Sequence, residues 1–249
     1  MPSSAEIQLE INDNHVAVLT LAAPDRRNAF VPDMARALVE ACEEIDRNPD
    51  VGAVVVRALG ASFCSGAHRE LLASAGKDPA RPDNYELLQL TYRAFTRVGE
   101  LLPPTIAAVR GHAVGAGLNL MLATDLRIIS ESAKIISGFA RIGIHPGGGN
   151  FLLVSRVAGR EVAAGLSLFA QDIDGQRAAA IGLAWEAVPE AEVEPRALEI
   201  AATVAGDPEL ARAAARSFRA ELGPPAVGWP AALEMEKGVQ MWSLRRREL

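Results

Sequence analysis

The chain has 249 residues, of which 49% are hydrophobic and 22% charged. This composition is typical of a globular protein with a full core and excludes a disordered or fibrous chain. The formal net charge of −6 provides no broad basic surface, so we predict no nucleic-acid partner.

The two cysteines, Cys42 and Cys64, are too few for a disulfide framework or for a metal site with CxxC spacing. We therefore predict a reducing compartment, no bound metal, and a buried structural role for Cys64. Residues 1 to 6 lack the cationic start and apolar core of a signal peptide. The apolar stretch 106–123 is interrupted by polar residues, so we predict a cytoplasmic protein without a membrane span.

The first half of the chain alternates strand and helix patterns. Residues 6–11 and 15–22 alternate apolar and polar positions around Asp13-Asn14, which predicts a hairpin. An amphipathic helix is expected to follow, then the order strand, helix, strand. The expected ranges are 32–47 for the first helix, 51–59 for the strand, 85–102 for the second helix and 105–109 for the second strand.

A helix is expected from about residue 116 to Ala123, followed by a second hairpin of strands 126–130 and 134–137, with Glu131-Ser132 at its turn. The remainder is predicted to be nearly all helical because its alanine-rich pattern has helical spacing. The expected helices are 151–158, 161–169, 176–181, 195–205, 209–222 and a final one, after Gly223-Pro224-Pro225, that ends at Arg245-Arg246-Arg247. The segment 74–84, with Gly76, Pro79 and Pro82, is predicted to be a mobile loop.

Three glycine-rich stretches follow apolar strands: residues 65–67, 111–117 and 146–149. Small residues at strand ends leave backbone amides uncovered, and uncovered amides attract negative charge. The pair Gly115 and Gly117 is followed by Leu120 where a dinucleotide fingerprint needs a small residue. No phosphate loop ending in Lys-Ser or Lys-Thr and no Gly-x-Ser-x-Gly elbow is present. The sequence thus disfavours a kinase, a dehydrogenase and a serine hydrolase.

Across almost its whole length the chain resembles the crotonase superfamily, which contains the enoyl-CoA hydratase/isomerase family. The resemblance lies in four motifs: Pro24-Asp25-Arg26-Arg27-Asn28-Ala29-Phe30, Ser62-Phe63-Cys64-Ser65-Gly66-Ala67, residues 111–117 with Thr124-Asp125-Leu126-Arg127, and Gly143-Ile144-His145-Pro146-Gly147-Gly148-Gly149. It implies an α/β fold whose ββα spiral core, residues 1–190, holds an acyl-CoA site. Residues 191–249 would form a helical trimerisation region of the same unit, in a homotrimer or a dimer of trimers.

The resemblance also implies roles for individual residues. The amides of Ala67 and Ala116 would donate to the thioester oxygen as an oxyanion hole, although both positions also suit simple close packing of backbone. The adenine and phosphate end of CoA would lie near Arg26, Arg27 and the segment Ser65, Gly66 and Ala67, although a surface arginine pair can be merely solvated. No cofactor is expected to be bound permanently, since coenzyme A enters as part of the substrate.

The chain departs from the family where hydratases carry two glutamates. The matching positions hold Asn119 and Phe139, neither of which carries a proton, so we predict that ordinary water addition through that pair is lost. Asp125 matches the family and is interpreted as structural. The candidates for proton transfer are His68 and His145, each of which can equally be a hydrogen-bonded loop histidine. Asn119 can hold a water or the acyl chain.

Three functions remain open from the sequence. The first is an acyl-CoA lyase or isomerase of fatty-acid metabolism with substituted acid and base residues. The second is a non-catalytic acyl-CoA-binding protein. The third is an acyl-CoA decarboxylase or hydrolase that uses His68 or His145. The leucines expected to line the acyl pocket or to belong to the core are Leu71, Leu72, Leu87 and Leu90.

Overall fold

The computed structural model describes residues 6–222 and 228–245 and confirms the predicted α/β class. The strands are β1 (Ile7–Ile11), β2 (Val16–Leu21), β3 (Ala53–Ala58), β4 (Ser62–Cys64), β5 (Thr105–Val109), β6 (His112–Val114), β7 (Leu126–Ser130), β8 (Lys134–Ile136), β9 (Ile173–Asp174) and β10 (Glu186–Val188). The α-helices are α1 (Pro32–Arg47), α2 (Arg69–Lys77), α3 (Pro82–Gly99), α4 (Ala116–Ala123), α5 (Asn150–Ala163), α6 (Gly175–Ala180), α7 (Val193–Ala205), α8 (Pro208–Glu221) and α9 (Trp229–Arg245).

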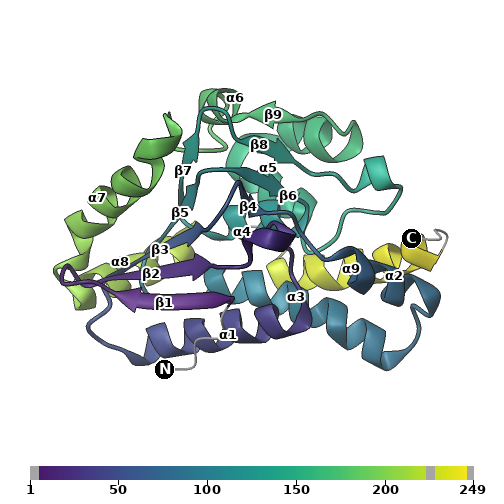
Figure 1. Ribbon diagram of the computed structural model, residues 1–249, viewed down its shortest axis with the longest axis horizontal. Coiled ribbons are helices and arrows are strands. Elements are labelled where there is room, and N and C mark those ends of the chain that lie inside the picture. Colours follow the sequence, from purple (N-terminus) through teal and green to yellow (C-terminus); the bar gives the residue numbers. More distant parts are fainter. Residues whose placement is uncertain (1–5, 223–227, 246–249) are drawn as a thin grey trace.

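The larger sheet has the strand order β1-β2-β3-β5-β7-β10. Its β1–β2 hairpin is antiparallel, as predicted, and the other pairs are parallel. Helix α7 covers one face of this sheet, while α1, α3 and α4 lie toward the other (Figure 1). Val55 accordingly packs in the cluster beside α7, and its neighbours Val54 and Val56 pack in the main core. Strands buried on both faces require the continuous apolar runs that the sequence shows.

The smaller sheet has the order β4-β6-β8-β9. It corrects the prediction of a second hairpin, because β7 belongs to the larger sheet and β8 to the smaller one. A tight turn does join them, with the Ala133 amide donating to the Ser130 carbonyl at 3.0 Å. Each strand then pairs in parallel with a different partner, β7 with β5 and β8 with β6. Turn chemistry alone therefore did not reveal that the chain passes between sheets.

The segment 74–84 is largely helical, which contradicts the prediction of a loop. Helix α2 extends to Lys77, and α3 begins at Pro82, where proline suits the first turn because its missing N–H has no helical acceptor to lose. Gly76 is small because α9 passes close by: a Cβ on it would lie 2.8 Å from the Leu244 carbonyl oxygen. Only the short connection between the two helices remains irregular.

The C-terminal part is mostly helical, as predicted, but it also supplies β9 and β10, which the sequence did not predict. The helices predicted at 151–158 and 161–169 meet at a kink in α5 at Gly159, whose φ is 85°, and a π-helical turn follows α5 at Ala164–Leu168. Helix α9 lies beside α2 at one end of the molecule (Figure 1). The predicted break at 223–225 and the end of the last helix beyond Arg245 lie outside the described residues. Within residues 6–222 and 228–245, none of the helices has both the length and the apolarity that crossing a bilayer requires.

Candidate active site

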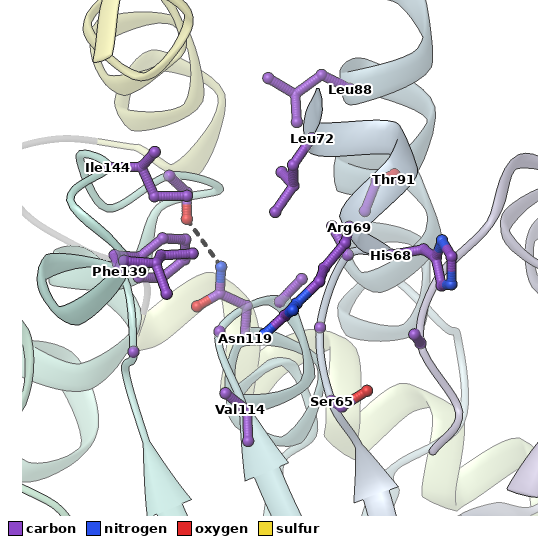
Figure 2. A pocket seen from close by; sticks show the side chains of 18 of the residues that line it. Ser65, His68, Arg69, Leu72, Leu88, Thr91, Val114, Asn119, Phe139 and Ile144 are labelled. Carbon is purple, nitrogen blue, oxygen red and sulfur yellow. Dashed lines mark hydrogen bonds between the residues drawn. The ribbon is translucent and has the colours of Figure 1, made fainter. Parts of the chain in front are cut away.

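A pocket of about 700 Å³ lies among α2, α3, α4 and α9. Its wall includes the apolar side chains of Leu72, Leu88, Val114 and Ile144. Figure 2 shows Leu72, Leu88 and Ile144 around the space above Asn119, and Val114 below it. Of the four leucines expected from the sequence, only Leu72 lines this pocket, and Leu88 joins it. The glycine-rich segments 65–67 and 115–116 form part of the same wall.

Two neighbouring strands deliver these glycine-rich segments to one edge of the smaller sheet. Strands β4 and β6 are parallel partners, so their carboxyl ends lie together. The chain leaves β4 through Ser65, Gly66 and Ala67, and leaves β6 through Gly115 into α4. The sheet topology thus brings together two backbone segments that lie about 50 residues apart in the sequence.

The amides of Ala67 and Ala116 are uncovered donors in this wall. Ala67 forms an isolated parallel bridge with Phe30, in which the neighbouring Gly66 carbonyl and His68 amide make the hydrogen bonds. Ala116 is the first residue of α4, whose amide has no acceptor within the helix. Among the described residues neither amide donates to a protein acceptor.

Gly66 allows these two segments to approach. Its φ of +90° lies in the region that favours glycine, and a Cβ on it would lie 2.8 Å from the Val114 carbonyl oxygen and 3.3 Å from the Ala116 nitrogen. Gly66 therefore lies directly against the residues that enter α4. The two residues whose amides were predicted to act together, Ala67 and Ala116, therefore line the same pocket.

The Asn119 side chain holds the wall of the pocket together. It is buried, with 1% of its surface exposed. Its Nδ2 donates to the Gly147 carbonyl at 2.9 Å, and its Oδ1 accepts from Asn150 Nδ2 at 2.9 Å. Asn150 in turn accepts from the hydroxyls of Ser137 and Ser167. This network fixes the loop 146–149 against α4, and its amides and hydroxyls cannot supply a base near neutral pH.

Phe139 occupies the other position at which the resemblance places a glutamate. Its side chain is 8% exposed, lines the pocket and belongs to the main core. The inner wall is therefore apolar at this point.

Two polar residues from distant helices also line the pocket. Tyr92 of α3 donates its hydroxyl to Gln240 Oε1 of α9, and both side chains are buried. Burial raises the pKa of Tyr92, with a smaller contribution from the Glu236 carboxylate, so its hydroxyl stays protonated and acts as a donor. Neither residue was among the sequence candidates, because no local motif marks side chains that meet only in the tertiary fold.

Glu236 links α9 to the loop behind the pocket. Its carboxylate accepts the Gly149 amide at 2.7 Å, at the start of α5. Burial raises its pKa from 4.5 to about 7, against the opposing effect of the amides of Gly149, Asn150 and Phe151. The charged form is thus costly in the folded protein although it is hydrogen-bonded.

This shift predicts a pH-dependent stability. Because the folded-state pKa lies above the ordinary value, the folded protein keeps a proton that the unfolded chain releases between pH 4.5 and about 7. The free energy of unfolding should therefore fall as pH rises through this window, by on the order of 2–3 kcal/mol from Glu236 alone. We expect Glu236→Gln to lack this decline in urea unfolding at pH 5 and pH 8. An identical decline in the variant would contradict the assignment.

The two candidate histidines differ in their surroundings. His68 lines the pocket, but its Nδ1 accepts the Glu70 amide at 3.4 Å and caps α2. Figure 2 shows its ring on the far side of Arg69 from Asn119. His145 is not among the lining residues: its Nδ1 lies 2.6 Å from the Pro146 carbonyl oxygen and its ring meets Phe151 edge-on. The structure therefore brings only His68 to the wall, facing away from Asn119.

The arginines expected near CoA also differ. Arg26 is held by Glu6 in a bidentate ion pair at 2.5 Å and donates to the Ala29 carbonyl. Arg27 is exposed, and among the described residues its guanidinium has no partner. Both line the pocket, together with Ser65, Gly66 and Ala67. The residues that the sequence placed near CoA therefore line one pocket, and of the two arginines Arg27 is the one without an ion-pair partner among the described residues.

Two structural interpretations are confirmed. Cys64 is fully buried, its Sγ donates to the Asn28 carbonyl, and burial raises its pKa to about 12, so it is a packed thiol. Asp125 accepts from the amide and the hydroxyl of Thr105 and pairs with Arg219, which ties α8 to the end of α4.

Comparison with known proteins identifies the family. Residues 11–241 match the model of the enoyl-CoA hydratase/isomerase family. A probable enoyl-CoA hydratase, EchA14 of Mycobacterium tuberculosis, is 41% identical over 216 residues, which cover 86% of this chain and 82% of that protein. The chain belongs to the enoyl-CoA hydratase/isomerase family.

Other known proteins are similar to the chain over most of their length. The 1,2-epoxyphenylacetyl-CoA isomerase of Escherichia coli is 32% identical, over 78% of this chain and 74% of that protein. Among solved structures, an enoyl-CoA hydratase from Mycobacterium avium subsp. paratuberculosis superposes with a TM-score of 0.84 at 25% identity, covering 100% of this chain and 97% of that one. The crotonase-type fold expected from the motifs is confirmed.

Proposed function

We propose that this family member binds an acyl-CoA thioester in the pocket and stabilises negative charge on its carbonyl oxygen through the amides of Ala67 and Ala116. The observation that carries the proposal is the pair of uncovered donors in an apolar wall. A developing enolate oxygen needs oriented donors in a site that excludes bulk water. Loss of one such donor typically costs about 3–4 kcal/mol of barrier.

The proposal assigns the CoA end to the pocket mouth. Arg27 is exposed and uncommitted there, while Glu6 occupies Arg26. A free guanidinium suits a phosphate group, since its planar donors match phosphate oxygens. Arg27 therefore contributes more to CoA affinity than Arg26, and the segment 65–67 lies beside the thioester.

The reaction is proposed to proceed without the two family glutamates, as a lyase or isomerase step in acyl-CoA breakdown. Asn119 is committed to the loop 146–149, and Phe139 is apolar. His68 is the proton carrier on the pocket wall, provided that its ring turns away from the start of α2, and His145 needs a larger movement. Decarboxylation or thioester hydrolysis with these histidines is the related alternative, since both also pass through charge on the carbonyl oxygen.

A non-catalytic acyl-CoA-binding protein is the second candidate function. The favouring observation is that the side chain at the first glutamate position is fixed in a structural hydrogen-bond network. Such a protein would keep the two amide donors and bind thioesters without converting them.

Mass-spectrometric turnover of an acyl-CoA panel, with parallel binding isotherms, tests the proposal. The panel contains crotonyl-CoA, a 3-enoyl-CoA and a malonyl-type CoA. Saturable binding with conversion of one member supports the enzyme, and saturable binding with no conversion of any member supports the second candidate. Absence of binding to every CoA ester would overturn both.

A further inference from the structure

One charged side chain in the pocket has no role in the proposal so far. Arg69 is the first residue of α2 and lines the pocket. The residue is exposed to solvent, and its side chain is directed along the pocket toward Asn119 (Figure 2). Within the described part of the chain, the Arg69 guanidinium makes no ion pair and no hydrogen bond. The pocket therefore contains an uncompensated positive charge.

The other charges of the lining do not neutralise it. Arg26 and Arg141 are paired with Glu6 and Asp172. The two lining carboxylates, Asp25 and Glu70, are exposed, and the Glu70 side chain keeps 91% of its surface accessible. The inner wall near Asn119 and Phe139 contributes only neutral groups. An anion entering the pocket would thus meet a cation and no buried carboxylate.

We infer that Arg69 selects an acyl group that carries a carboxylate. This inference rests on the proposed acyl-CoA site and names its substrate class. An arginine fork binds a carboxylate through two parallel hydrogen bonds, which gives direction as well as affinity. The replacement of both family glutamates by neutral residues removes the like charges that would repel such a substrate.

The position of Arg69 limits the length of the acyl group. It follows Ala67 by two residues, a span of at most about 7 Å. With the thioester carbonyl at the Ala67 amide, a guanidinium that extends toward Asn119 favours a carboxylate a few carbons further along the acyl chain (Figure 2). Succinyl and glutaryl thioesters fit this description, whereas long unbranched acyl chains offer no partner for the charge.

Isothermal titration with matched acyl-CoAs tests the inference. Succinyl-CoA is compared with butyryl-CoA, and glutaryl-CoA with valeryl-CoA, so that each pair differs only in a carboxylate replacing a methyl group. We expect the wild type to bind the carboxylated member about ten-fold tighter or more. Arg69→Met should remove this preference and change the affinity for the neutral esters less than about two-fold, and Arg69→Lys should retain part of it. These ratios correspond to about 1.4 kcal/mol per ten-fold.

The control is Arg160→Met, an exposed arginine of α5 outside the pocket lining, which should leave every affinity unchanged. Succinyl-pantetheine, which lacks the adenosine and its phosphates, should show the same dependence on Arg69. Equal affinity for both members of each pair in the wild type would overturn the inference. So would an equal loss for charged and neutral esters in Arg69→Met, because Arg69 would then serve the CoA phosphates. Absence of any acyl-CoA binding would instead overturn the proposed function itself.

Discussion

Replacement of Ala116 by proline is expected to lower turnover of the acyl-CoA substrate about 10²–10³-fold. The change removes the N–H that we assign to the thioester oxygen. Proline is well tolerated at the first position of a helix, which Ala116 occupies in α4, and no protein hydrogen bond is lost because this amide has no acceptor among the described residues.

Ala116→Ser is the matched control, since it alters the side chain and keeps the N–H. Its turnover should stay within about three-fold of wild type, and thermal melts of both variants report whether α4 still forms. Ala67→Pro removes the second proposed donor and should act in the same direction. Full activity in a folded Ala116→Pro variant would contradict the role of this amide.

Wild-type protein is expected to hydrate crotonyl-CoA at least 10²–10⁴-fold more slowly than a hydratase that keeps both carboxylates, because general acid and base assistance is worth that factor. Asn119 and Phe139 cannot exchange protons, and the buried Asn119 side chain is already hydrogen-bonded to Gly147 and Asn150.

The control for this experiment is binding of crotonyl-CoA to the same preparation, which should remain measurable. Hydration within ten-fold of a two-carboxylate hydratase would show that another group acts as base. His68→Asn would then test the histidine on the pocket wall. Binding with negligible hydration agrees with the account.

The sequence predicted the parts of the fold that are determined by local pattern. The β1–β2 hairpin and helix α1 follow from period-two and helical spacing, and the continuous apolar runs of β3 and β5 indicated strands covered on both faces. Two predictions were wrong because the same local signal is compatible with two structures. Proline can mark a loop or the start of a helix, and a turn can join two paired strands or two different sheets. Pro82 starts α3 instead of breaking the chain, and the turn before β8 leads into a different sheet.

For the candidate site, the sequence indicated which backbone segments come together, but it indicated fewer of the side chains that line the pocket. Segments 65–67 and 115–116 meet as expected, because glycines after two strands allow close approach. Tyr92 and Gln240 lie on helices nearly 150 residues apart, and nothing local indicates that they meet. Arg69 lies two residues after Ala67 and was available from the sequence, but the direction of its side chain required the fold. The two candidate histidines are the opposite case. The residue type suggested proton transfer, but in the structure Nδ1 of each ring contacts a backbone group.

The most direct test of the central claim is the infrared carbonyl stretch of a saturated acyl-CoA labelled with ¹³C at the thioester, bound to the wild-type protein. Two oriented N–H donors polarise the carbonyl, so we predict a stretch at lower frequency than that of the same ester in water, and a smaller shift in Ala116→Pro. A bound ester whose carbonyl frequency equals the value in water would contradict the assignment of Ala67 and Ala116 as the oxyanion hole.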